Sequence, residues 1–186
     1  NIKDFGAVNG GTQSNTEAIN AAISKANADG GGRVVVPSGI WLSGPIELKS
    51  NIDLHLENGA VLLFDKSEEE YPLYMSDFEG MECIRAKSPI MAENASNIAI
   101  TGTGTIDGSG QLWRPIKQFK MTQRQWDALL KKSSYTVTEK DGQIWLPTKT
   151  SFDGWNKSKE KSPELERLDT AQKYWDFFRP VMVRLY

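Results

Sequence analysis

Apolar and polar residues alternate with a period of two through the first part of the chain, in short runs separated by Gly, Pro, Ser and Asn. This pattern is typical of β-strands and not of helices. The expected strands lie at 34–36, 40–42, 46–48, 52–56 and 61–64. Strands this short, joined by turns this regular, favour the three-sided coils of a parallel β-solenoid over a meander of hairpins. The pattern alone also allows a β-sandwich.

One segment of the chain repeats another. Ser50–Leu63 reads SNIDLHLENGAVLL, and Ser96–Trp113 returns to the same Ser-Asn-Ile opening at lower fidelity. A repeat on the scale of about 20–50 residues marks a solenoid or a related array. We therefore expect Ile52 and Leu54 to stack on Ile98 and Ile100 in successive coils.

A helix is expected before the first strands. Ala18, Ile19, Ala22, Ile23 and Ala26 recur at helical spacing. The segment 14–17 fits a capping box, in which Ser14 and Glu17 satisfy each other's backbone N–H groups, and glycines at 30–32 end the helix. Because a β-solenoid would otherwise expose an open apolar end, we expect this helix to cap the first coil.

Residues 115–178 have a different pattern and predict a mixed α/β insertion between the coils of 1–114 and the start of the next coil at 179–186. Met121–Lys132 has Trp126, Leu129 and Leu130 on one helical face. A hairpin is expected at 134–137 and 143–146, and a second helix begins near Ser162.

Composition and charge exclude several classes of partner. The chain has 186 residues, 39% of them hydrophobic, which suggests one domain with a core. A net charge of −2 with scattered basic residues gives no footprint for nucleic acid. No apolar run approaches the roughly 20 residues that span a bilayer, so we expect no membrane partner. The single Cys83 excludes an intrachain disulfide and is expected to be a small buried side chain.

Several motifs carry a family resemblance. The segments 4–8 (DFGAV), 15–19 (NTEAI) and 31–39 (GGRVVVPSG) resemble the opening of pectate-lyase-like right-handed β-helix proteins. The segments 43–52 and 56–63, together with ITGTGTIDGSG-x-x-W at 100–113, resemble the polygalacturonases, glycoside hydrolase family 28. The resemblance covers roughly residues 1–114 and resumes at 178–183.

The resemblance implies an all-β fold, a right-handed parallel β-helix that is here an incomplete solenoid with an N-terminal capping helix. It also implies a secreted or periplasmic glycosidase that cleaves α-linked galacturonic acid or rhamnogalacturonan bonds of pectin with inversion and needs no cofactor. The expected partner is a pectic polysaccharide or oligogalacturonide. An insertion beside the cleft would favour action from the chain end.

Two other functions stay open. A non-hydrolytic carbohydrate-binding β-helix of the tailspike type would share residues 4–26, although the segment 96–113 favours the hydrolase. A pectin lyase would use calcium and a basic residue, and no cluster of acids is arranged as a calcium site.

The sequence offers no catalytic residue and no metal ligands. Inversion needs two carboxylic acids, which the polygalacturonases carry in an Asn-Thr-Asp cluster and an Asp-Asp pair, with Gly-His-Gly and Arg-Ile-Lys nearby. None of these four motifs is present. Asn15-Thr16-Glu17 opens the expected helix, His55 stands between leucines and faces outward, and Asp107 precedes a glycine and shapes a turn. We therefore expect the chain to be the N-terminal part of a longer enzyme whose remaining residues supply the catalytic acids.

The insertion holds four of the six tryptophans, Trp126, Trp145, Trp155 and Trp175. At helical apolar positions, Trp126 and Trp175 are expected to form the core of the insertion. Trp155, in an expected polar loop at 152–157, and Trp145 are the candidates for stacking on a sugar ring. Lys157 and Lys149 could meet the carboxylate of a uronate. Trp155, Trp145 and Lys157 are therefore the expected substrate-binding residues.

Overall fold

A computed structural model describes residues 1–186, which form two compact units. The first unit contains residues 1–71, 87–109 and 181–186. The second contains residues 72–86 and 110–180. None of the helices in either unit has the length and apolar character needed to cross a bilayer.

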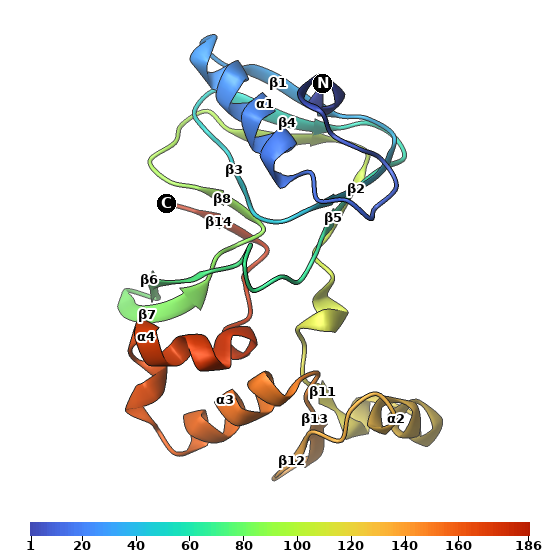
Figure 1. Ribbon diagram of the computed structural model, residues 1–186, viewed down its shortest axis with the longest axis vertical. Helices are drawn as coiled ribbons and strands as arrows, with labels where there is room; N and C mark the ends of the chain where they lie inside the picture. The colour runs from blue at the N-terminus through green and yellow to red at the C-terminus, as the bar shows by residue number, and fades with distance from the viewer. The chain divides into compact units, whose positions relative to one another are not determined.

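The first unit is a right-handed parallel β-helix, as the sequence predicts. Its three sheets each contain three parallel strands, and the chain visits the sheets in turn (Figure 1). The first sheet holds β1 (Gly32–Val36), β4 (Ile52–Leu56) and β9 (Ala99–Gly102). The second holds β2 (Gly39–Ser43), β5 (Ala60–Phe64) and β10 (Thr105–Asp107). The third holds β3 (Ile46–Glu47), β8 (Ile90–Ala92) and β14 (Val183–Leu185).

The Ser-Asn-Ile repeat marks one corner of successive coils. Asn51 and Asn97 both adopt left-handed backbone conformations, with φ of 62° and 55°, which Asn tolerates better than most residues. The Asn97 side-chain amide donates a hydrogen bond to Asn51 Oδ1 at 2.9 Å. The Asn51 N–H donates to the Ser96 carbonyl at 2.9 Å. The repeated motif therefore stacks directly on itself.

Alternate side chains of β4 point into the coil. Ile52, Leu54 and Leu56 are buried, whereas Asp53 and His55 between them are partly exposed. Leu54 pairs with Val34 on one side and with Ile100 on the other, which confirms the expected stacking of Leu54 on Ile100.

The second copy of the repeat is less buried than the first. Ile100 is 39% exposed and Ile98 is only partly buried. The reason is that β9 pairs with β4 alone and has no strand on its other side in this sheet.

Helix α1 (Thr16–Ala28) packs on the coils through Ile19, Ala22 and Ile23, which belong to the same core as the strands. The expected capping box is wrong. The N-cap residue is Asn15, and the Ser14 hydroxyl instead donates to the Glu70 carboxylate at 2.8 Å. A carboxylate from a distant part of the sequence thus replaces the local partner that Ser14 was expected to have.

The second unit contains two antiparallel sheets and most of the helices. A hairpin consists of β6 (Leu73–Phe78) and β7 (Met81–Ala86), and a three-stranded sheet has the order β11 (Ile116–Lys117), β13 (Gly142–Trp145), β12 (Thr136–Glu139). The helices are α2 (Gln123–Leu130), α3 (Lys149–Lys159) and α4 (Leu168–Ala171). Short 3₁₀ segments lie at Ile2–Phe5 in the first unit and at Gly110–Leu112, Gln118–Lys120, Pro163–Leu165 and Gln172–Phe177 in the second.

This unit agrees with the expected helix and hairpin of the insertion but adds two elements. The sequence pattern did not indicate the β6–β7 hairpin, on which Cys83 lies partly exposed and not buried as expected. It also assigned 152–157 to a polar loop, which is wrong because these residues belong to α3. The Thr148 hydroxyl caps that helix by accepting from the Ser151 N–H at 3.0 Å.

Candidate sugar-binding site

A hollow of about 210 Å³ lies in the second unit between helix α3, the β12–β13 turn and the segment that follows β11. Aromatic and charged side chains make up most of its wall. The lining residues are Lys117, Phe119, Glu139, Lys140, Asp141, Gly142, Gln143, Ile144, Trp155 and Lys159. The volume is below the roughly 300–1,000 Å³ of sites that enclose a drug-sized ligand, so the hollow suits a single sugar ring.

Helix α3 brings Trp155 and Lys159 to one wall of the hollow, because residues four positions apart share a helical face. The Trp155 indole N–H donates to Glu139 Oε1 at 3.1 Å. The Lys159 ammonium pairs with the same carboxylate at 2.9 Å and lies 5.8 Å from the centre of the indole ring. These contacts hold the polar edge of the indole against β12.

The hydrogen bonds to Glu139 also set its charge. The hydrogen bond donated by Lys159 has the larger effect and that donated by Trp155 the smaller, and together they hold the pKa of Glu139 below its ordinary value. The ionised carboxylate therefore remains the fixed partner of both side chains.

Trp155 also borders a second, more open hollow of about 410 Å³. The two hollows share Glu139, Trp155 and Lys159 in their walls. The partly buried indole thus separates two depressions, and it is the kind of flat apolar surface on which the C–H groups of a sugar can stack.

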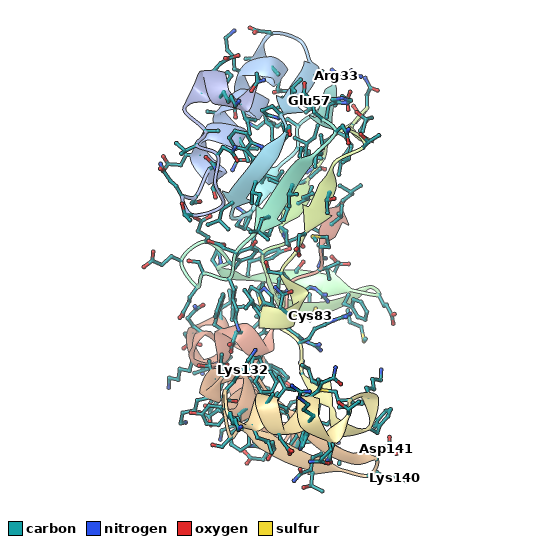
Figure 2. All side chains as sticks on the ribbon, turned by 90° about the vertical axis from the view of Figure 1, so that its right-hand side faces the viewer. Arg33, Glu57, Cys83, Lys132, Lys140 and Asp141 are labelled. Atoms are coloured by element: carbon teal, nitrogen blue, oxygen red, sulfur yellow. The ribbon has the colours of Figure 1, made fainter.

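The first hollow has more basic than acidic groups in its wall. Lys117, Lys140 and Lys159 face Glu139 and Asp141. Figure 2 shows Lys140 and Asp141 at the tip of the β12–β13 hairpin, with Lys132 well away from them. Because Lys159 is engaged by Glu139, Lys117 and Lys140 are the cations available to an anionic ligand.

The structure separates the three site residues that the sequence proposes. Trp155 lines both hollows. Trp145 is only 5% exposed in a core with Trp126 and Leu129, and its indole N–H donates to the Ser133 carbonyl at 3.1 Å. This position leaves the Trp145 ring no free face for a sugar.

Lys157 lies on a different side of α3 from the hollows. It pairs with Glu160 and Glu164 at 3.3 and 3.4 Å and lines neither of the two depressions. Lys149 pairs with Asp153. The other two expected core tryptophans, Trp126 and Trp175, are both buried, which confirms that prediction.

Sequence reasoning missed Lys117, Phe119, Glu139 and Lys159. The signal for Lys159 was present, because Trp155 and Lys159 have the i, i+4 spacing of neighbours on a helix. The polar composition of 152–157 indicates a loop and hides this helical spacing. Lys117 and Glu139 come from different strands of the sheet, and only their pairing with β13 brings both near Trp155.

Three polar residues that the sequence does not assign to catalysis have structural contacts in the first unit, namely Asp107, Asn15 and His55. Asp107 accepts the Ser109 N–H at 2.8 Å, which confirms its role in a turn. The Asn15 side chain accepts from the Val8 N–H and donates to the carbonyls of Val8 and Leu42. His55 Nδ1 lies 2.8 Å from the Thr101 hydroxyl on the outer face of the coil.

Comparison with known proteins identifies the family and several relatives of the chain. The model of the family described as "Rhamnogalacturonase A/epimerase, pectate lyase-like" matches residues 1–143. A probable polygalacturonase of Vitis vinifera is 37% identical over 121 residues, which are 60% of this chain and 25% of that protein. An exo-poly-α-D-galacturonosidase of Dickeya chrysanthemi is 36% identical over 118 residues, which are 59% of this chain and 19% of that protein.

Among solved structures, a hyperthermoactive exopolygalacturonase from Thermotoga maritima aligns with 100% of this chain and 38% of its own, at 30% identity and a TM-score of 0.64. The match therefore includes the second unit as well as the coils. The chain spans well under half the length of each of these three proteins.

Proposed function

Since the chain belongs to the rhamnogalacturonase A/epimerase family of pectate-lyase-like proteins, we propose that the whole protein hydrolyses the α-linked galacturonic acid or rhamnogalacturonan bonds of pectin. The polygalacturonase and exopolygalacturonase relatives support this assignment. We place the protein outside the cytoplasm, secreted or periplasmic, where a pectic polymer is accessible.

The observation that carries the proposal is the hollow at Trp155. It combines an indole surface with Lys117 and Lys140 in a space suited to one ring. A galacturonic acid unit presents both an apolar C–H face and a carboxylate, so this wall complements its two kinds of surface. We assign to the hollow the binding of one uronate unit of the substrate.

The catalytic step belongs to carboxylic acids outside this chain. In the inverting mechanism one acid protonates the leaving oxygen while a second carboxylate activates water on the opposite face of the sugar. The second unit contributes substrate binding, and with it we propose release of short products from the chain end. The two exo-acting relatives support this mode.

The test is the product pattern of the whole protein on polygalacturonate and on rhamnogalacturonan. We expect reducing ends to rise while the viscosity of the polymer falls slowly, because end action shortens each chain little. Proton NMR of the first product should show the inverted anomer. A rapid fall in viscosity would refute end action, and an initial product of retained configuration would refute inversion.

The same assay separates the two alternatives. A lyase would create a carbon–carbon double bond in its product, detectable by ultraviolet absorption, and a tailspike-type binding protein would bind the polymer without releasing product. Either result would refute the proposed hydrolysis.

A further inference from the structure

A third hollow, of about 610 Å³, lies next to the Trp155 hollow in the second unit. Its wall is formed by Gly110, Gln111, Arg114, Pro115, Ile116, Lys117 and Lys120. The wall contains three cations and no carboxylate. Lys117 belongs to the walls of both hollows, so the two depressions are neighbours.

The cations of this third hollow are exposed and make no ion pair. Arg114, Lys117 and Lys120 are all exposed, and none is within salt-bridge distance of an acid. All three basic residues of helix α3 contrast with them, since Lys149, Lys157 and Lys159 are each paired with Asp or Glu. A set of unpaired cations around one depression is what an anionic ligand requires.

An aromatic ring holds two of these cations near each other. The ammonium groups of Lys117 and Lys120 lie 5.6 and 6.0 Å from the centre of the Phe119 ring, which is 61% exposed. The negative face of an aromatic ring attracts cations at such distances. Phe119 therefore keeps the two ammonium groups at the boundary between the hollows.

Arg179 adds a further positive charge near Arg114. The pKa of Arg179 is lowered mainly by partial desolvation and to a smaller extent by the charge of Arg114. The two guanidinium groups thus lie close enough to repel each other. A bound carboxylate would relieve this repulsion and could accept two parallel hydrogen bonds from one guanidinium fork.

We propose that Arg114, Lys117 and Lys120 form a carboxylate-binding site for a uronate unit adjacent to the unit at Trp155. The inference deepens the proposed function and rests on it for the identity of the sugar. Two hollows that share Lys117 suit two consecutive units of a polyuronate, in which every unit carries a carboxylate. The site would accept free uronates and reject their methyl esters, because an ester has no negative charge and a weaker acceptor.

The test measures binding to the 186-residue chain, titrated with trigalacturonate and followed by NMR with the Trp155 indole N–H as one probe. We expect Arg114→Gln and Lys120→Gln each to weaken binding about five- to tenfold and Lys117→Gln to weaken it more, since Lys117 borders both hollows. Lys132→Gln, which removes an exposed lysine outside the hollows, is the matched control and should bind as the unchanged chain does. Spectra of the free variants show whether each is folded.

The methyl ester of trigalacturonate supplies the second arm. It should bind the unchanged chain at least as weakly as trigalacturonate binds the Arg114→Gln variant, because it lacks the carboxylates of both units, and Arg114→Gln should not weaken its binding further. Equal affinity for acid and ester, undiminished binding in the Arg114 and Lys120 variants, or no binding of trigalacturonate at all would each overturn the site.

Hydrolysis by the whole protein is scored separately. If the binding pattern holds but polygalacturonate is not cleaved, the carboxylate site stands and the proposed hydrolase is wrong. If polygalacturonate is cleaved but the variants bind normally, the hydrolase stands and the site is wrong.

Discussion

At the scale of single residues, two tryptophans of the second unit have opposite surroundings. Trp155 borders two hollows and is fixed at its polar edge by Glu139. Trp145 lies on the central strand of a three-stranded sheet and is 5% exposed. Composition could not separate them, because both are tryptophans in a polar part of the sequence.

The first prediction follows from this difference. In the whole protein, Trp155→Ala should raise the KM for oligogalacturonides and leave kcat nearly unchanged, since a stacking contact made equally in ground and transition states contributes uniform binding. Trp145→Ala should instead lower the melting temperature, because it opens a cavity that costs about 3–5 kcal/mol. Kinetics and thermal melts of both variants check this, with Trp155→Phe as the conservative control. Unchanged KM in Trp155→Ala would remove its role in binding.

Asp65 is a second residue whose surroundings matter. The pKa of Asp65 is raised from 3.8 to about 6, mainly by burial and to a smaller extent by the negative charge of the nearby Glu70. Its Oδ1 atom is buried without a hydrogen-bond partner. Tyr71 lies near the same two acids. The pKa of its phenol is raised mainly by burial and to a smaller extent by the charges of Asp65 and Glu70. The ionised form of Asp65 is therefore disfavoured in the folded chain.

The second prediction is a pH dependence with a definite sign. Because the folded pKa of Asp65 lies above its unfolded value, its contribution to stability is complete below about pH 3.8 and is lost as the pH rises through about 6. Asp65→Asn should therefore melt at a higher temperature than the unchanged chain at about pH 7, and the difference should disappear by about pH 4. Thermal melts across this range measure it. A difference that grows toward acid pH would contradict the assigned shift.

At the scale of elements, the strands of the first sheet differ in how deeply the neighbouring coils bury their side chains. Leu54 is fully buried between β1 and β9, whereas Ile100 on β9 is 39% exposed. The third prediction is that Leu54→Ala costs about 2–5 kcal/mol of unfolding free energy and Ile100→Ala about 1 kcal/mol. Denaturant unfolding of the 186-residue chain ranks them, and the reverse order would reject the register between β4 and β9.

The elements also show which parts of the fold the sequence could predict. The coils were predictable because period-two alternation and the Ser-Asn-Ile repeat are local signals that the packing reinforces. Helix α3 was not, because Gly154 and a polar composition argue against a helix. Gly154 is required there by packing, since a Cβ atom at this position would lie 2.5 Å from Phe177 Cβ. The requirement comes from a residue distant in sequence and leaves no local pattern.

At the scale of the whole molecule, the candidate site was predictable only in part. The sequence indicated that an insertion rich in tryptophan would bind sugar, and Trp155 remains the central residue of that hypothesis. Lys157, which the sequence proposes, is paired with Glu160 and Glu164, whereas Lys117, which the sequence does not single out, lies in the hollow. Which cation is paired depends on the tertiary arrangement of α3 and the hairpin. The spacing of residues along the chain therefore does not reveal which lysine is ion-paired.

Asp65 and Glu70 lie close enough to interact, and a pair of acids in which one pKa is raised resembles the acid and base of a glycosidase. Its contacts argue for a structural role. The Glu70 oxygens accept hydrogen bonds from the Ser14 and Thr16 hydroxyls at 2.8 and 2.6 Å, at the start of α1. Both oxygens are thus engaged in holding the 65–71 segment to the helix, and the carboxylate is not free to activate water.

The last prediction is therefore that the 186-residue chain, purified alone, releases no reducing ends from polygalacturonate or rhamnogalacturonan above the buffer level. In the whole protein, Glu70→Gln should lower the melting temperature, because the carboxylate is the acceptor for both hydroxyls. It should leave kcat within about twofold, because an acid that only supports the fold does not enter the transition state. Turnover by the isolated chain would place catalytic carboxylates within these 186 residues. A loss of kcat in Glu70→Gln of about 10²-fold or more, on the scale that general acid–base catalysis supplies, would place one of them in the first unit.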